Sequence, residues 1–538
     1  MADRPRLASF HRRLTTPFGD RASMQWTDGY YTGTEYTSGY YPNLAPDHLR
    51  FVCHAAGVRC RIPDRPTYLE LGFGRGVSVN IHAAANAGVF WGVDFNPAHV
   101  AHAERLAEAS GADVVLSEEG FADFCARADL PMFDVIALHG VWSWISEANR
   151  QAILGLIRLR LRPGGVAYVS YNAQPGWSAL APVRHLLELG RDRPAGAAAG
   201  VDDPGGVERA LDFLKDVVGA SPKFFAEVKP AANLASGLPK KNRSYLAHEY
   251  LNADWHIPYF ADVAGAMAEA KLTFVASARV LDRVNDLNLT PEAVALLDRC
   301  KPLELREAVR DFMVNQRFRP DVFVKGLVRM TVAEQERFWA GQAFVLASAR
   351  DEIVLAVSGA LGEAVLPAEV YGPVVDALAA EDYRPKTLPE VVAASGLTTL
   401  RTMDAVSALT VLVGMEVLRP ARVPSAQEAA RSRAYNAHVL ERAVTGPALK
   451  HLAAPVIGGG LACPRPVQLF LRAWLAGDRE ASALAASTWA VFQTTGDRAV
   501  KNDREMVTPE ENLEVLTEMA ERFIQAILPL YRALGVLD

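Results

Sequence analysis

A glycine-rich turn after a short apolar stretch is the feature that most limits how this sequence can fold. Residues 68–76 read YLELGFGRG, so three glycines alternate with other residues directly after a predicted strand. Glycine permits positive φ angles and lets backbone N–H groups approach a ligand closely. A second apolar stretch, 89–94, ends in Asp94. A glycine turn after one strand and a carboxylate at the end of the next are typical of α/β folds that bind a nucleoside.

The spacing of the glycines narrows the choice of ligand. The dinucleotide fingerprint is G-x-G-x-x-G, whereas Gly72, Gly74 and Gly76 give G-x-G-x-G, and Glu70 precedes the first of them by two residues. This arrangement suits a ligand with a cationic amino-acid end, such as S-adenosylmethionine (SAM). Glu70 would meet the ammonium group through water, and Asp94 would bind the ribose hydroxyls. A glycine-rich turn in some other α/β domain remains the alternative.

Strands and helices alternate through the first third of the chain, which predicts a parallel sheet with right-handed crossovers. Ligands of such sheets bind beyond the carboxyl ends of the strands. The predicted strands place polar or glycine residues at that edge, namely Gly72–Gly76, Asp94, Ser117–Glu119, His139–Trp144 and Tyr171–Asn172. Their convergence is a stronger signal than any single motif.

Length and composition exclude several classes of protein. A chain of 538 residues is too long for one hydrophobic core, and about two to four domains are expected. The net charge of −6 gives no electrostatic footprint for nucleic acid, and the five cysteines lack a C-x-x-C pair, so no metal site is expected. We find no signal peptide and no apolar run near the roughly 20 residues that span a bilayer. The sequence therefore predicts a cytoplasmic protein without a membrane span.

Five strings of residues in this order resemble the seven-stranded SAM-dependent methyltransferases: ELGFGRG, GVDFNP, LSEEGF, FDVIALHGVWSW and LRPGGVAYVSYN. Further strings at 36–42, 170–177 and 245–251 are similar to the bacterial methyltransferases that carry a regulatory domain. The resemblance implies an α/β, Rossmann-like seven-stranded core with a helical insertion, followed by mostly α-helical C-terminal domains. Characterised relatives in this family include lysine methyltransferases that act on bacterial outer-membrane proteins.

The resemblance also implies roles for individual residues. Gly72, Gly74 and Gly76 would lie against the methionine part of SAM, and Asp94 would bind the ribose. Glu118 or Glu119 would reach the adenine amino group, while Phe95 or Phe121 packs on the ring. His139 and Gly140 would line the floor near the sulfonium.

The methyl acceptor is less well defined by the sequence. The tyrosine-rich segment 30–41 precedes the first strand, where such enzymes place a flap over SAM, and its rings could hold an amine by hydrogen bonds and cation–π contact. We predict Tyr36, Tyr40, His139, Asn172 and His248 as catalytic or acceptor-contacting residues, with packing as the alternative for the tyrosines and the histidines. The predicted acceptor is a protein lysine. A glycan or small metabolite is the alternative, and a non-catalytic SAM-binding regulator is a third option.

The remaining organisation is predicted from composition and periodicity. Residues 387–413 resemble a helix-turn-helix with a wing at 415–419. The second helix carries one basic residue, Arg401, whose charge is balanced by Asp404, so we expect this region to contact protein and not nucleic acid. A protein substrate is the expected partner, and a homodimer is left open. The predicted segments are an N-terminal region with the flap (1–66), the SAM-binding core (67–180), a helical insertion (181–265), a return-strand and regulatory region (266–330), a winged-helix-like domain (331–424) and a C-terminal helical domain (425–538).

Overall fold

The computed structural model describes residue 30 and residues 39–192, 205–396, 402–446 and 449–538. Tyr36 and Arg401 lie outside the described residues, as does most of the tyrosine-rich segment.

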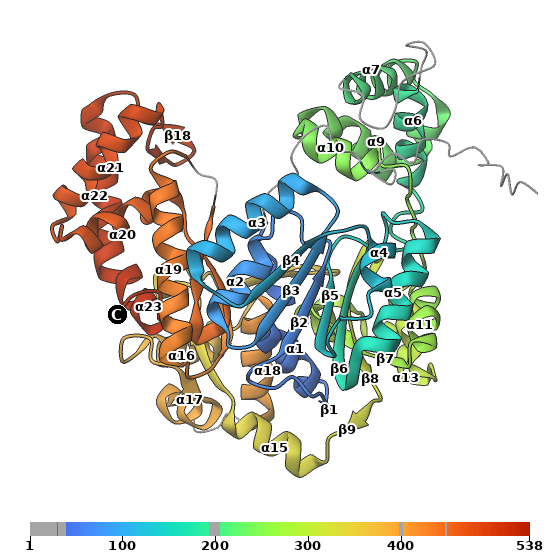
Figure 1. Cartoon of the computed structure of the whole chain (residues 1–538), viewed down its shortest axis with the longest axis horizontal. Helices are drawn as coiled ribbons and strands as arrows, with labels where there is room; N and C mark the ends of the chain where they lie inside the picture. Colours follow the sequence, from blue (N-terminus) through green and yellow to red (C-terminus); the bar gives the residue numbers. More distant parts are fainter. Residues whose placement is uncertain (1–29, 31–38, 193–204, 397–401, 447–448) are drawn as a thin grey trace, which may run out of the picture.

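One sheet forms the centre of the described chain (Figure 1). Its strands are β2 (Thr67–Leu71), β3 (Val89–Asp94), β4 (Val114–Glu118), β5 (Phe133–Leu138), β6 (Leu161–Asn172), β7 (Leu272–Ser277) and β8 (Phe318–Lys325). These seven described strands follow the order β4-β3-β2-β5-β6-β8-β7. The first five in this order run parallel, and β8 is antiparallel to both β6 and β7. The predicted Rossmann-like seven-stranded core is therefore confirmed.

Helices cover both faces of the sheet. The helices of one face are α1 (Pro46–Ala55), α2 (Val77–Ala85) and α3 (Pro97–Ser110), and those of the other are α4 (Phe121–Ala126), α5 (Glu147–Arg160) and α11 (Phe260–Glu269). Local sequence sets these elements. Asn96 caps α3 by accepting a hydrogen bond from the Ala98 N–H, Pro97 follows at the first helical position, and Gly111 ends the helix in a left-handed conformation.

A helical lobe is inserted between β6 and α11, and we use this name for residues 181–250. Its helices are α6 (Ala181–Arg191), α7 (Gly206–Gly219), α8 (Lys223–Glu227), α9 (Lys229–Gly237) and α10 (Arg243–Tyr250). The lobe has a hydrophobic core of its own, with Leu187, Leu211 and Leu246 among its buried residues. It stands beyond the carboxyl edge of the sheet (Figure 1). Because α11 packs against β7 and α5, the predicted end of the insertion at residue 265 falls inside a helix of the core.

A small antiparallel sheet organises the region after β8. Its strands are β10 (Ala343–Leu346), β13 (Lys386–Thr387) and β14 (Leu418–Ala421), in the order β13-β10-β14. The accompanying helices are α15 (Val332–Gly341), α16 (Ala368–Ala379), α17 (Leu388–Ser395) and α18 (Thr402–Gly414). Helices α17 and α18 occupy the segments predicted as a helix-turn-helix, and the winged-helix description stays a prediction.

The C-terminal region is mostly helical and packs on the methyltransferase-like core. Its elements are α19 (Ala426–Ala443), β15 (His451–Ala454), β16 (Gly459–Ala462), α20 (Arg465–Ala476), α21 (Ala481–Thr495), α22 (Pro509–Arg522) and α23 (Leu528–Ala533). Helix α19 lies against both α2 and α3. All nine residues of α2 are consequently buried, with the sheet on one side and the C-terminal region on the other.

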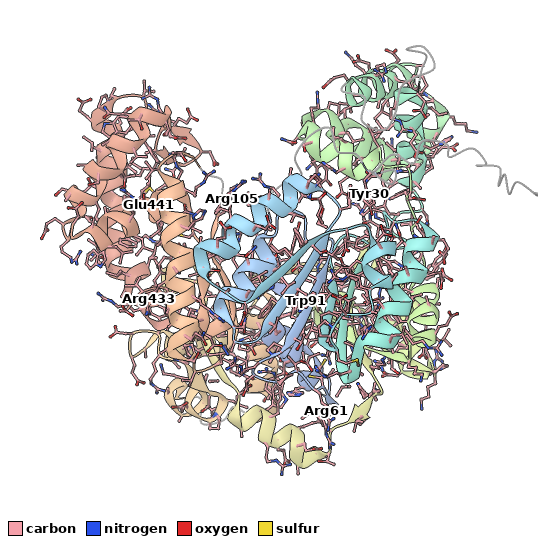
Figure 2. All side chains as sticks on the ribbon, in the orientation of Figure 1. Tyr30, Arg61, Trp91, Arg105, Arg433 and Glu441 are labelled. Carbon is pink, nitrogen blue, oxygen red and sulfur yellow. The ribbon has the colours of Figure 1, made fainter. Side chains whose placement is uncertain are left out.

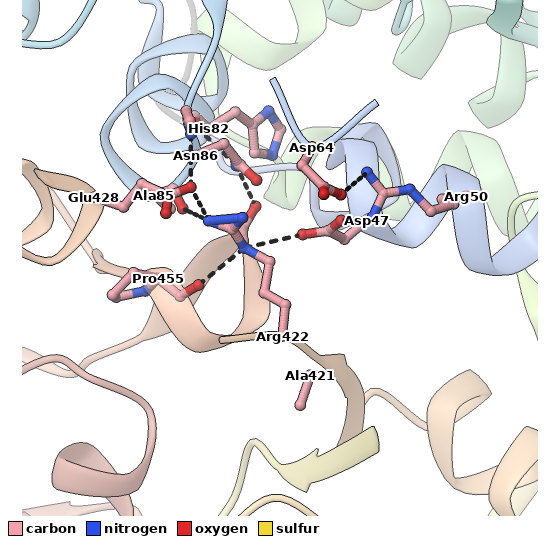
Figure 3. A network of polar contacts seen from close by, with 12 residues as sticks. Asp47, Arg50, Asp64, His82, Ala85, Asn86, Ala421, Arg422, Glu428 and Pro455 are labelled. Carbon is pink, nitrogen blue, oxygen red and sulfur yellow. Dashed lines mark hydrogen bonds and ion pairs between the residues drawn. The ribbon is translucent and has the colours of Figure 1, made fainter. Parts of the chain in front are cut away.

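A buried polar network joins these parts (Figure 3). The Arg422 guanidinium pairs with Glu428 of α19 and lies 3.4 Å from a carboxylate oxygen of Asp47 in α1. It also donates hydrogen bonds to the carbonyl oxygens of Ala85 (3.1 Å) and Pro455 (3.3 Å). One side chain thus connects α1, α2 and the C-terminal region. Among the described helices, none is long and apolar enough to cross a bilayer.

Candidate active site

A cavity of about 1390 Å³ lies between the carboxyl edge of the sheet and the helical lobe. It is lined by residues that follow β2, β3, β4, β5 and β6 and by one face of α10. The predicted cofactor residues that line it are Glu70, Gly72, Gly74, Asp94, Phe95, Glu118, Glu119, Phe121, His139 and Gly140. Tyr30, beneath the helical lobe (Figure 2), packs at a tilt against Phe95 with 5.2 Å between ring centroids. The structure thus gathers residues from five strands at one edge.

The glycine turn contributes a bare stretch of backbone to the cavity. Gly74 has φ +58°, and its N–H donates to the Asp94 carboxylate at 2.8 Å. A Cβ added at Gly74 would meet nothing within 4 Å, so the space above this backbone is open to a ligand. The methionine part of SAM fits against this backbone, because no side chain occupies the space at Gly74.

Gly76 lies outside the cavity lining. It caps α2 with φ +70°, and a Cβ added there would lie 2.3 Å from the Ala103 Cβ. Its absent side chain lets α2 and α3 approach each other. The structure therefore places Gly76 in helix packing, in contrast to the predicted contact with SAM.

The carboxylate of Asp94 is fixed by three donors at the end of β3. One oxygen accepts from the Asn96 N–H at 3.0 Å and lies 3.1 Å from His99 Nδ1, while the other accepts from Gly74. The side chain is 7% exposed, and it faces the cavity. An oriented, nearly buried carboxylate beside the glycine turn fits the hydroxyls of a ribose.

Two adjacent acids end β4 beside Asp94. Glu118 pairs in register with Asp94 and is exposed to the cavity. Glu119 accepts a hydrogen bond from the Ser117 hydroxyl at 2.7 Å and pairs with Arg127 at 3.2 Å. These contacts occupy Glu119, so they favour Glu118 as the partner of the adenine amino group.

Glu70 is a buried acid at the end of β2. Burial raises the pKa of its carboxyl to about 8, the Tyr68 hydroxyl at 3.4 Å opposes the shift, and the charge of Asp94 adds to it. At neutral pH the carboxyl therefore holds a proton when no cation is near. A cationic ligand reverses this, because an opposite charge favours the ionised form.

This reversal makes ligand affinity depend on pH. Binding of SAM is expected to release a proton from Glu70, so affinity should fall by about tenfold per pH unit as the pH decreases below 8. Calorimetry in buffers of different ionisation enthalpy would measure both the affinity and the released proton. The Glu70→Gln variant is the control, because it retains only the titration of the ligand's own amino group. An equal proton release in that variant would contradict the assignment.

His139 forms a wall of the cavity at the end of β5. Its Nδ1 lies 2.8 Å from the Tyr168 hydroxyl, and its ring packs at a tilt against Tyr41 with 3.9 Å between centroids. Burial, aided by the charge of Arg279, lowers the pKa of His139 to about 3. The neighbouring Gly140 N–H donates to the Ser170 hydroxyl at 2.8 Å. His139 is thus a fixed, neutral ring, which suits positioning better than proton transfer.

The other predicted catalytic residues are distributed differently. Asn172 and His248 line the cavity. Tyr40 does not, since its hydroxyl accepts a hydrogen bond from the Gly460 N–H at 2.6 Å and its ring packs against His82 and His451. Burial raises the pKa of this hydroxyl to about 12. This placement argues against a catalytic role for Tyr40.

Several cavity residues were not predicted individually. The most prominent are Tyr41, Ser143, Trp144, Tyr245, Glu249 and Arg317. Ser143 and Trp144 belong to the segment 139–144 that was predicted at this edge, and Tyr41 belongs to the predicted flap at 30–41. The helical lobe also carries a signal, since Tyr245, His248, Glu249 and Asn252 recur at the spacing of one helical face. The flap pattern did not distinguish Tyr41 from Tyr40, because neighbouring residues of an extended segment face opposite ways.

Comparison with known proteins assigns the core and the region after it. Residues 69–165 match the model of a methyltransferase domain, and residues 242–325 match a predicted methyltransferase regulatory domain. The uncharacterized protein sll1526 of Synechocystis sp. is 34% identical over 519 residues, covering 95% of this chain and all of that protein. The uncharacterized protein RP789 of Rickettsia prowazekii is 27% identical over 296 residues, 54% of this chain and 51% of its own length.

Solved structures agree on the fold. PKMT2 from Rickettsia typhi, determined in complex with AdoHcy, superposes with a TM-score of 0.67 at 18% identity, over 93% of this chain and 99% of that one. The matched domains and the cavity together identify S-adenosylmethionine as the cofactor. The chain therefore belongs to the class I SAM-dependent methyltransferases that carry a methyltransferase regulatory domain.

Proposed function

We propose that this methyltransferase acts on a protein, with the side-chain amine of lysine as the acceptor. The observation that carries the proposal is the charge of the cavity. Two arginines, Arg75 and Arg317, line it. Six acids also line it, namely Glu70, Asp94, Glu118, Glu119, Asp123 and Glu249, of which Glu70 is neutral until a cation binds and Glu119 is paired with Arg127. A cavity with this balance favours cationic ligands, both the sulfonium cofactor and an ammonium acceptor.

The shape of the cavity supports a large acceptor. Exposed residues such as Glu118 and Arg317 line it, so it reaches the surface, and it continues from the cofactor residues to α10 of the helical lobe. We assign acceptor binding to this lobe. The likeness in fold to PKMT2 extends over nearly the whole of both chains, and characterised relatives in the family that the sequence resembles methylate protein lysines.

For methyl transfer, the protein mainly has to align the acceptor nitrogen with the methyl carbon and the sulfur. Bound SAM, held beside Gly74 and Asp94, would supply an activated methyl group for transfer to the acceptor nitrogen, with the electron pair of the broken carbon–sulfur bond left on sulfur. The lysine ammonium must first release its proton to water in the cavity mouth. Fixed groups such as Asp94 and the His139 ring hold the reactants in one geometry, which is the main source of rate in such a reaction.

Radiolabelled methyl transfer tests the proposal. The protein is incubated with methyl-tritiated SAM and with separated cell-envelope proteins, cytosolic proteins, lipids, glycans and small metabolites. We expect label in a protein band that yields methyl-lysine on hydrolysis. A reaction with excess S-adenosylhomocysteine is the control, because the product competes for the cofactor site. Label confined to lipid, glycan or small molecules would overturn the proposal, and label on another amino acid would overturn its lysine part.

A further inference from the structure

Helix α10 turns a polar and aromatic face toward the cofactor edge of the sheet. Tyr245, His248, Glu249 and Asn252 all line the cavity. The opposite face, with Leu246, Ala247 and Tyr250, is buried in the core of the helical lobe. The lobe thus holds this helix rigidly while it presents side chains to the bound ligands. A carboxylate on this face is therefore in a position to contact a ligand bound in the cavity.

Tyr41 stands between the cofactor residues and the helical lobe. Its ring packs at a tilt against His139, which follows β5. Burial raises the pKa of its hydroxyl, and the charges of Glu249 and Glu70 raise it further. At neutral pH Glu70 holds a proton, so the carboxylate that acts on Tyr41 is Glu249 of the lobe. A cation bound beside Tyr41 would be attracted by the same carboxylate.

Arg317 is the cationic residue of this wall, and its guanidinium is 5.2 Å from the centre of the Trp177 ring. Burial raises the pKa values of Tyr245 and Tyr250, and on both of them the charges of Glu249 and Arg317 act in opposite directions. The influences on the pKa of Tyr41 are burial and the carboxylates of Glu249 and Glu70. Among the described charges of the lobe, Glu249 is thus the one that acts on Tyr41.

The other five acids of the cavity come from the sheet and from α4, on the cofactor side. Asp94 and Glu118 end β3 and β4, at the positions suited to ribose and adenine. Glu70 lies in β2, Glu119 follows β4 and is paired with Arg127, and Asp123 is in α4. Among the described lining residues, Glu249 is the acid that comes from the helical lobe. It is therefore the acid on the side from which an acceptor enters.

We propose that Glu249 and Tyr41 form the subsite that binds the cationic amine of the methyl acceptor. The carboxylate pairs with the ammonium, and the tyrosine ring and hydroxyl contact the same group by cation–π attraction and a hydrogen bond. This inference rests on the proposed function for the nature of the acceptor. It adds the residues that select a charged amine over a neutral hydroxyl or amide.

The test compares two glutamate variants of the same lobe. Glu249→Gln removes the charge and keeps the shape, whereas Glu227→Gln removes an exposed glutamate of α8 that lies 3.5 Å from Lys223. With a lysine-containing acceptor we expect Glu249→Gln to raise KM by about ten- to a hundredfold, as for loss of a charged hydrogen-bonding partner. Glu227→Gln should leave KM unchanged, and Glu249→Asp should restore part of the loss. The SAM affinity of Glu249→Gln, measured by calorimetry, should equal that of the unaltered chain.

The outcomes separate the subsite from the proposed function. If the unaltered chain forms methyl-lysine but Glu249→Gln keeps its KM, the subsite is wrong and the function stands. If the unaltered chain labels a different acceptor, the proposed function falls, and the same variants are assayed on that acceptor. Equal KM values there would overturn the subsite as well, whereas a selective loss on a cationic acceptor would retain it.

Discussion

Replacement of Arg319 by methionine is expected to lower the free energy of local unfolding around β8 by about 3–5 kcal/mol, the usual cost of breaking a buried ion pair from one side. The side chain is 5% exposed and contacts three acids of the regulatory region. Its Nε lies 2.9 Å from Asp321, its Nη2 lies 3.2 Å from Glu307, and its Nη1 pairs with Asp311. Methionine keeps much of the volume and removes all of these bonds.

The loss would spread because, within the described part of the chain, the ion pairs of Asp311 and Asp321 are both made with Arg319. Burial already raises the pKa of Asp311 to about 7, although Arg319 opposes the shift. Without the guanidinium these carboxyls must take up protons or drive β8 out of the sheet. Asp321 also accepts a hydrogen bond at 2.6 Å from the hydroxyl of Tyr171, a cavity residue. The network therefore connects the last strands of the sheet to the floor of the active site.

Hydrogen exchange measures this effect locally, which matters because a chain with several cores need not unfold in one step. Amide protection in β8 should fall by about two to three and a half orders of magnitude, at one order per 1.4 kcal/mol. The matched control is Arg472→Met, which breaks an exposed pair with Glu441 in the C-terminal region and should leave β8 unchanged. Unaltered protection in Arg319→Met would show that the buried pair contributes nothing to the fold.

The same strand shows why sequence reasoning missed part of the sheet. Residues 318–325 read FRPDVFVK, in which Arg319, Pro320 and Asp321 interrupt the apolar pattern of a buried strand. Periodicity treats such charges as solvent-exposed. In the structure Arg319 and Asp321 face inward and pair with each other. Arg319 also pairs with Asp311 of α14 (Leu303–Val314), a partner that the pattern of residues 318–325 does not show.

The cofactor side of the site was predictable because its signals are local. A glycine turn, an acid at the end of the next strand and residues such as His139 each follow a strand whose apolar pattern is clear. Parallel topology then brings these strand ends to one edge without further information. The cavity residues Glu70, Asp94 and His139 follow from this rule.

The acceptor side and the domain packing depend on contacts distant in sequence. Tyr40 and Tyr41 are neighbours of the same type, and only the contact of Tyr40 with Gly460 shows which of them faces the cavity. Likewise, α2 is buried on every side because α19 covers it. A helix of small apolar residues indicates that it is covered, but the sequence does not say by which segment.

Two alanine substitutions in the glycine turn are expected to separate folding from cofactor binding. Gly76→Ala places a methyl group 2.3 Å from the Ala103 Cβ at a residue with φ +70°, so overpacking and backbone strain should together cost about 2–5 kcal/mol of stability. Gly74→Ala has φ +58° but an open surrounding, so its cost should be about 1–2 kcal/mol, from the backbone conformation. The new methyl group would instead occupy the open space beside Asp94.

The two variants should therefore lose different properties, stability for Gly76→Ala and SAM affinity for Gly74→Ala. Gly76→Ala should lose hydrogen-exchange protection in α2 and α3, while the fraction that remains folded binds SAM as the unaltered chain does. Gly74→Ala should keep that protection and bind SAM at least tenfold more weakly by calorimetry, the equivalent of about 1.4 kcal/mol or more. Because Gly74 lines the cavity and Gly76 does not, a loss of SAM affinity in the folded fraction of Gly76→Ala, or normal affinity in Gly74→Ala, would contradict this division of roles.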